Sequence, residues 1–356
     1  MPRARVIFLL LLTGACAVPA RATAQTRRLA LDFDTTAAAA ALAILEREQG
    51  GAPVPDASWS RLFSTRGYIR LKEREAAMRR DFTDSSFVDF IGSDTLIART
   101  PALRRTLDQW ARTDVEGAAR RALAYLPDDA RITATVYIMI KPRTNSFVWD
   151  LARDPAIFLY LDPALSAAEF ENTVAHELHH IGLASVSARA DSLAARLPER
   201  ARLAAGWMRA FGEGFAMLAA AGGTEVHPHI ASPDSTRARW DSTVGHFNRD
   251  LDTLAAFFGK ILSGELHPDS VRAVASTFYG IQGPWYTVGW KMAVTIEERF
   301  GRAELVRCIT DPRRLLMRYN AAAAERNRTR GEALALWPRE LIAALDPGLA
   351  DAPRRP

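Results

Sequence analysis

Residues 166–184 read SAAEFENTVAHELHHIGLA and carry a strong helix signal. The segment opens with a capping box, in which Ser166 caps the helix and the Glu169 side chain reaches back to it. Apolar residues then recur at helical spacing and predict one stripe that faces a core: Phe170, Val174, Leu178 and Ile181. The pattern therefore predicts an amphipathic helix over residues 166–183.

A second face of this helix carries two histidines, His176 and His180, four positions apart. Side chains at this spacing project one above the other, so two neutral imidazoles can reach one Zn²⁺ at about 2.0–2.1 Å. Glu177 lies about 100° round the helix, where it can act as the general base on a metal-activated water instead of binding the metal. Together these residues form the HExxH pattern of zinc metallopeptidases. His179 is the spare histidine, which we expect to support the ligands from behind or to face solvent.

A catalytic zinc site needs a third protein ligand, and two glutamates compete for this role. Glu213 has glycines on both sides, Gly212 and Gly214, which allow neighbouring backbones to approach closely. Glu199 is flanked by proline and arginine, so we expect it to be solvated. We therefore expect Glu213 to be the third ligand and keep Glu199 as the alternative.

HELHH followed by GEGFA is similar to the HExxH plus EGxA signature of gluzincins, and the whole chain resembles a family of exported bacterial zinc-dependent peptidases. The resemblance implies a zincin-like fold in which His176, His180 and Glu213 hold one Zn²⁺ per chain. Glu177 would then be the catalytic base for hydrolysis of peptide bonds. The gap between His180 and Glu213 is longer than in the best-known gluzincins, which implies an additional loop or helix at residues 184–203.

Hydrolysis also needs a group that stabilises the oxyanion beside the metal. Our candidate is the catalytic Tyr286, near the start of a helix predicted over residues 284–300, which Pro284 opens and Gly301 closes. The competing interpretation is that Tyr286 packs beside Trp285 and Trp290 in the core.

Other tyrosines and histidines give weaker signals. Tyr279 and His246 are further candidates for the oxyanion donor. His227 and His229, in VHPH, could form a second metal site, but histidines in polar loops more often face solvent. His267 stands before a proline, which indicates a turn.

The order of patterns predicts an α+β fold that is predominantly helical. A small sheet at residues 131–162, two strands of it a hairpin, precedes the HExxH helix. Residues 25–34 look like an exposed leader, and further helices are expected at about 201–221, 236–262, 270–279 and 332–345. We expect a signal peptide at 1–24, an N-terminal helical region at 25–126, a zincin-like domain at 127–348 and a flexible tail at 349–356.

The first residues argue for export. A basic start, an apolar run and small residues at positions 22 and 24 form a secretory signal peptide, which predicts a periplasmic or extracellular protein. Thr13 stands where lipoprotein signals usually carry leucine, so a lipid anchor on Cys16 is not expected. Cleavage after Ala24 would leave one cysteine, Cys308, and therefore no internal disulfide.

Charge and hydropathy narrow the class of partner. Cleavage removes three arginines and no acid, so the formal charge falls from +5 to 43 − 41 = +2. This small balance does not favour nucleic-acid binding, and no stretch after the signal is long and apolar enough for a stable membrane span. We expect a peptide or protein substrate, and the sequence leaves the oligomeric state open. Two alternatives stay open: a zinc amidase acting on a non-protein amide, and a non-catalytic exported binding protein with a vestigial metal site.

Overall fold

The computed structural model describes residues 28–346 of the chain, and the predicted signal peptide and tail lie outside this range. The strands are β1 (Leu29–Asp34), β2 (Ile132–Met139), β3 (Phe147–Trp149) and β4 (Ala156–Tyr160). The helices are α2 (Thr36–Gln49), α3 (Asp56–Phe63), α4 (Arg66–Ala77), α5 (Asp84–Ile91), α6 (Asp94–Ile97), α7 (Thr100–Trp110), α8 (Val115–Leu123), α9 (Ala167–Ala184), α10 (Ser187–Ala195), α11 (Glu199–Met208), the 3-10 turn η1 (Arg209–Phe211), α12 (Gly212–Ala221), α13 (Asp234–Gly245), α14 (Phe247–Ser263), α15 (Pro268–Thr277), α16 (Pro284–Phe300), α17 (Arg302–Cys308), α18 (Pro312–Arg330) and α19 (Arg339–Ala344).

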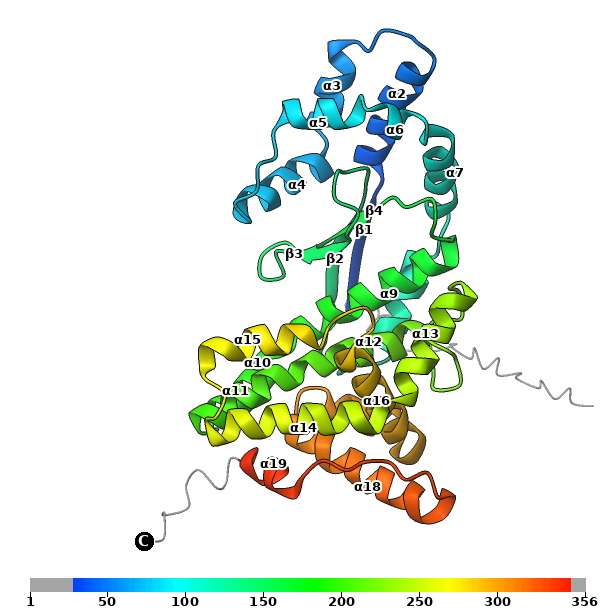
Figure 1. The fold of residues 1–356 in the computed structure, drawn as a ribbon. Coiled ribbons are helices and arrows are strands. Elements are labelled where there is room, and N and C mark those ends of the chain that lie inside the picture. Colours follow the sequence, from blue (N-terminus) through cyan, green and yellow to red (C-terminus); the bar gives the residue numbers. More distant parts are fainter. Residues whose placement is uncertain (1–27, 347–356) are drawn as a thin grey trace, which may run out of the picture.

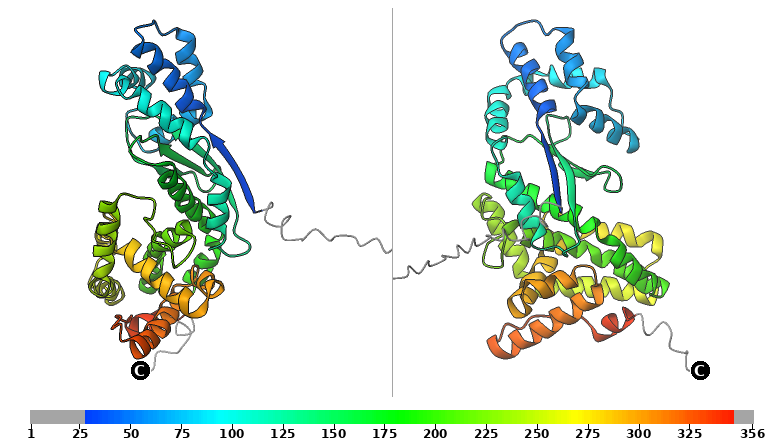
Figure 2. Two further views of the ribbon diagram at one scale, coloured as in Figure 1. Left: turned by 90° about the vertical axis from the view of Figure 1, so that its right-hand side faces the viewer. Right: turned by 180° about the vertical axis from the view of Figure 1, so that it is seen from behind.

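The prediction of an α+β, predominantly helical fold is confirmed (Figure 1). The sheet lies beside the N-terminal helices, α9 crosses beneath it, and the helices from α10 onward form the other half of the molecule. The turned views in Figure 2 show the same order, with the helices up to α7 at one end and α18 and α19 at the other. Within residues 28–346 no helix is both long and apolar enough to cross a membrane.

The sheet has the strand order β1-β2-β4-β3. β1 and β4 run parallel to β2, and β3 pairs antiparallel with β4, so the predicted hairpin is confirmed and β3 forms an edge. The exposed leader expected at residues 25–34 is wrong for residues 29–34, which form β1. Its alternating Leu29, Leu31 and Phe33 pack against the main core, which is the period-2 pattern of a half-buried strand. The sheet thus joins one strand from before residue 126 to three strands from after it. The predicted boundary between an N-terminal helical region and a zincin-like domain stays a prediction.

Helix α9 connects two hydrophobic cores. Its predicted apolar stripe is fully buried against the sheet and α8 in the first core. On its other side it packs against α12, which belongs mainly to the second core, formed largely by α11, η1, α12 and α14 to α19. The capping box at its start is confirmed, because the Glu169 carboxylate accepts from the Ser166 N–H at 3.0 Å and the Ser166 hydroxyl accepts from the Glu169 N–H at 3.2 Å. This buried helix therefore fixes the position of every residue in the HExxH pattern.

The helices after α9 differ from the prediction in several places. The single helix expected over 201–221 is interrupted by η1, and the one expected over 236–262 changes direction at His246. Only residues 339–344 of the segment 332–345 are helical, whereas the Arg-rich α18 was not predicted. The helix over 284–300 is confirmed as α16 with the same bounds. Residues 184–203, expected to hold an additional loop or helix, contain α10 and the first half of α11.

Helices α12 and α16 cross with their backbones almost in contact at Gly214 and Gly289. A Cβ on Gly214 would lie 2.0 Å from the backbone nitrogen of Trp290, and one on Gly289 would lie 2.6 Å from the Phe211 carbonyl oxygen. The close approach expected from the glycines around Glu213 is therefore confirmed at Gly214. It is wrong at Gly212, where a Cβ would meet the Leu183 side chain at an ordinary 3.5 Å.

Candidate metal centre

The two histidines of α9 and Glu213 of α12 converge on one point. The Nε2 atoms of His176 and His180 lie 3.0 Å apart, and each lies 3.2 Å from Oε2 of Glu213. Within residues 28–346 this is the one group of three or more His, Cys, Asp or Glu side chains whose donor atoms gather closely enough to hold a metal ion. The side chains of His176, His180 and Glu213 are 13%, 24% and 19% exposed, so the cluster is largely buried but still accessible to solvent.

Local backbone structure explains why Glu213 reaches the histidines. The 3-10 turn η1 rotates the chain between α11 and α12, and Glu213 then falls in the first turn of α12. Helix α12 packs against α16 through the close contact at Gly214, and it also packs against α9. The carboxylate is thereby aimed at the His176 and His180 face of α9.

The spacing of the three donor atoms fits a tetrahedral zinc site. Ligands about 2.0–2.1 Å from a tetrahedral Zn²⁺ lie about 3.3–3.4 Å from one another. The observed separations of 3.0 and 3.2 Å are slightly shorter and need only a small expansion. Two imidazole nitrogens and one carboxylate oxygen are also the donor set of several catalytic zinc sites. The residues present therefore fit a zinc ion, with one corner left for a further ligand.

Burial and hydrogen bonding shift the pKa values of this cluster in opposite directions. Desolvation alone would raise the pKa of the Glu213 carboxyl, but the imidazoles of His176 and His180 outweigh it and hold that pKa far below its usual range. Burial lowers the pKa of His180, yet the Glu213 carboxylate more than compensates and raises it. The carboxylate is therefore ionised at neutral pH, as a metal ligand must be.

Three further side chains face the same cluster. Glu177 has no hydrogen-bond or ion-pair partner within residues 28–346, and its charge acts on both His180 and Tyr286. The Tyr286 ring lies parallel to that of His176, with centroids 6.3 Å apart. Burial, followed by the Glu213 carboxylate, raises the pKa of Tyr286, and the same two causes raise the pKa of Tyr279. Both hydroxyls therefore stay protonated at neutral pH and can donate hydrogen bonds.

His179 is fully buried, so of the two positions expected for it the solvent-facing one is wrong. Burial lowers its pKa well below 6.5, and the neighbouring His180 and His176 lower it further. The backbone of Tyr125 opposes this shift, although no group within residues 28–346 has hydrogen-bond geometry to either ring nitrogen. His179 is thus a neutral imidazole packed behind His180, with their ring centroids 6.3 Å apart.

The alternative third ligand, Glu199, does not approach the histidines. It is the first residue of α11, is exposed, and lines a separate cavity with Leu203 and His267. His267 caps the start of α15, which confirms the turn expected there.

The other histidines are used in hydrogen bonds or lie elsewhere. His227 accepts from the His229 N–H at 3.0 Å and contacts Asp241 at 3.1 Å, which occupies both of its ring nitrogens. His229 is bound to Gln282 at 2.8 Å, so within the described residues this pair belongs to a hydrogen-bond network instead of a cluster suited to a metal. His246 stands at the junction of α13 and α14 and is exposed.

Two features of the site were not found from the sequence. Gly289 completes the backbone contact that positions α12, and a glycine inside a predicted helix was the signal that could have revealed it. The contact between His229 and Gln282 holds the loop before α16, where Gln282 has a positive φ of 60°. No periodic pattern in the sequence marks such a contact between two loops. Gln282 lies just before α16, the helix that carries Tyr286.

Among the comparisons with known proteins, only the comparison with family models gives a match. No curated protein and no solved structure matches the chain. A family model described as "Putative zinc dependent peptidase (DUF5700)" matches residues 59–328. The match spans α4 to α17 and most of α18, and therefore contains the whole His176, His180 and Glu213 cluster. Since it covers most of the chain, the protein belongs to this family of zinc-dependent peptidases.

Proposed function

We propose that this protein is a gluzincin-type zinc metallopeptidase that hydrolyses peptide bonds with His176, His180 and Glu213 as ligands of one Zn²⁺. The observation that carries the proposal is the convergence of the Glu213 carboxylate on two imidazole nitrogens at 3.2 Å. Membership of the zinc-dependent peptidase family supports the same reaction. When bound, zinc supplies Lewis acidity, which lowers the pKa of water to about 7 and polarises a carbonyl group.

The remaining chemistry belongs to side chains of this chain. Glu177 is the general base, because it follows His176 on α9 and its carboxylate has no hydrogen-bond or ion-pair partner within residues 28–346. It accepts the proton of the attacking water and passes it to the leaving amine. Tyr286 keeps its proton at neutral pH and donates a hydrogen bond to the carbonyl oxygen as negative charge develops on it.

The cellular location that we propose for this protein rests on the sequence alone. The apolar N-terminal segment and the single cysteine that would remain after its removal support action in the periplasm or outside the cell. Cys308 is buried, and burial raises the pKa of its thiol to about 12, so it is an unreactive core side chain.

Metal analysis of two variants tests the ligand set. The wild-type protein is expected to hold about one zinc per chain. Glu213→Ala should weaken zinc binding on the order of a hundredfold or more, because it removes one of three ligands. Glu199→Ala is the matched control and should keep its zinc. If Glu199→Ala loses the metal and Glu213→Ala retains it, the ligand set is wrong.

Tyr286→Phe tests the oxyanion donor. We expect kcat for a peptide substrate to fall by about 10²–10³-fold, with KM and zinc content little changed, because the lost hydrogen bond acts mainly in the transition state. Tyr279→Phe, which removes the other nearby hydroxyl, should have a much smaller effect. An unchanged kcat in Tyr286→Phe would assign this residue to packing alone.

A further inference from the structure

A cavity of about 360 Å³ lies directly beside the candidate metal centre and includes His180 in its wall. The other walls are mainly apolar and come from four parts of the chain, with Leu183, Met208, Phe215 and Leu315 among them. Cys308 also lines the cavity, and its raised pKa keeps the thiol uncharged. The volume lies within the range of small-ligand pockets, about 300–1,000 Å³. This cavity can therefore accept an apolar side chain next to the site of bond cleavage.

The charge of Arg209 does not make the first cavity suited to a charged ligand. Arg209 is the one arginine or lysine among the described residues that line the cavity, and it forms an ion pair with Asp191 at 2.8 Å. It also donates to the Ser187 carbonyl oxygen at 3.2 Å. Its guanidinium is thereby held against α10, and the cavity favours an uncharged group.

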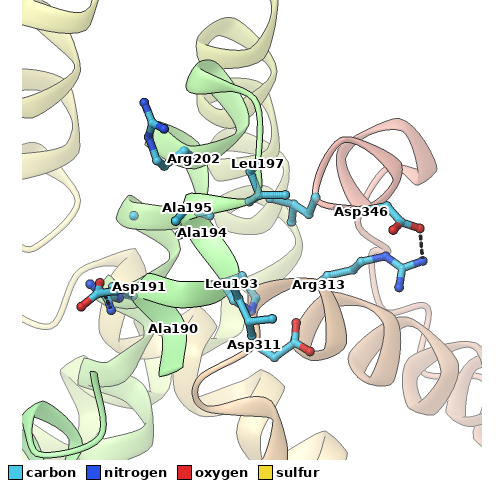
Figure 3. Close-up of a pocket in the computed structure, with 15 residues that line it drawn as sticks. Ala190, Asp191, Leu193, Ala194, Ala195, Leu197, Arg202, Asp311, Arg313 and Asp346 are labelled. Atoms are coloured by element: carbon cyan, nitrogen blue, oxygen red, sulfur yellow. Dashed lines mark ion pairs between the residues drawn. The ribbon is translucent and has the colours of Figure 1, made fainter. Parts of the chain in front are cut away.

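A second cavity of about 420 Å³ adjoins the first and shares Ala190, Arg209 and Pro312 with it. Figure 3 shows its floor along α10, where Ala190, Leu193 and Ala194 lie, and the ion pair between Arg313 and Asp346 at one side. Its lining mixes apolar side chains with charged ones, so it is more polar than the first.

Both cavities are built on the segment that separates His180 from Glu213. Helix α10 forms a wall of each, and α11 supplies Met208 to the first and Ala205 to the second. Leu151, which also lines the first cavity, follows two residues after the edge strand β3 and is exposed. Within residues 28–346 β3 is an edge strand, and an extended peptide paired with it would lie close to Leu151.

We propose that α10 and α11 form a substrate groove with two compartments, an inference that rests on the proposed peptidase function. The compartment beside His180, named here the inner pocket, binds a leucine-sized apolar side chain next to the scissile bond. The adjoining compartment, the outer pocket, binds the following part of the same peptide. The substrates are therefore peptides that extend past the cleaved bond, with an apolar residue beside that bond.

Peptide binding tests the inner pocket without relying on hydrolysis. The probe is a dye-labelled Gly/Ser peptide with one central leucine, and its affinity for the Glu177→Gln protein is measured by fluorescence anisotropy, with and without zinc. Replacing the leucine by glycine or aspartate should weaken binding at least about tenfold, because a buried leucine side chain is lost. Equal affinity for the three peptides would overturn the proposal.

Three alanines of α10 give matched variants. Ala190→Leu narrows both pockets and should weaken binding of the leucine peptide about tenfold. Ala188→Leu adds the same side chain at an exposed position that lines neither pocket, and should bind as the parent protein does. Ala194 lines only the outer pocket. Ala194→Leu should therefore remove the additional affinity that a longer peptide gains by reaching this pocket. Circular dichroism and zinc content identify a variant that fails to fold, and unchanged binding in a folded Ala190→Leu protein would overturn the groove.

Hydrolysis by the protein with Glu177 intact separates this proposal from the proposed function. Cleavage of a peptide library by the zinc-loaded protein, read by mass spectrometry, should occur beside apolar residues. Zinc-dependent cleavage with no such preference would overturn the groove and leave the peptidase function standing. Selective binding of leucine peptides with no cleavage in the library would overturn the peptidase function and leave the groove standing.

Discussion

Glu177→Gln is expected to lower kcat for peptide hydrolysis by about 10²–10⁴-fold, the usual contribution of general acid–base catalysis. The amide keeps the size of the carboxylate but cannot accept the proton of the attacking water. Glu177 has no hydrogen-bond or ion-pair partner within residues 28–346, so the substitution breaks no structural contact of that kind. Zinc content and thermal stability should therefore stay close to those of the parent protein.

The measurement is the rate of casein or peptide cleavage at matched zinc occupancy. Glu171→Gln is the control on the same helix: its carboxylate accepts a hydrogen bond from Arg121 at 2.8 Å, away from the histidines. This control should retain most of the activity, since an ion pair that is partly exposed contributes little. Full activity in Glu177→Gln would rule out its role as the base. Retained zinc without hydrolysis of any peptide by the wild-type protein would favour the zinc amidase or the non-catalytic binding protein.

Gly214→Ala is expected to destabilise the protein by about 3 kcal/mol or more, at the upper end of the cost of overpacking. The added Cβ would lie 2.0 Å from the Trp290 nitrogen and 2.3 Å from the Gly289 carbonyl carbon. These are backbone atoms of a buried helix, so α12 and α16 must separate to relieve the clash. Because Glu213 precedes this contact by one residue, zinc binding should weaken as well.

Urea unfolding and zinc titration measure the two effects. Gly206→Ala is the control, since a Cβ there meets nothing within 4 Å at an exposed position of α11. It should stabilise the protein by about 0.5–1 kcal/mol, because alanine loses less conformational freedom than glycine in a helix. A Gly214→Ala protein as stable as the parent would show that α12 and α16 do not touch at this point.

Residue patterns along the chain predicted the local elements well where one helix or strand contained the whole signal. The capping box, the apolar stripe of α9 and the bounds of α16 depend on neighbours a few positions apart, and these agree with the structure. The strand β1 was missed, because LALDFD is short and its partner β2 lies about a hundred residues later in the chain. The break at η1 was also missed, because it depends on the packing of α12 against α9 and α16, which are distant in the sequence.

The sequence by itself determined that His176 and His180 share one helix face with Glu177 beside them, because helical spacing alone sets that geometry. It also indicated that close backbone packing was expected around Glu213. Only the tertiary structure decided that Glu213, and not Glu199, lies beside the two imidazoles. Residues 181–212 intervene between these side chains, so their distance depends on the turn at η1 and on the contact of Gly214 with Gly289. Contacts between residues so far apart in the chain follow from packing, which no local pattern specifies.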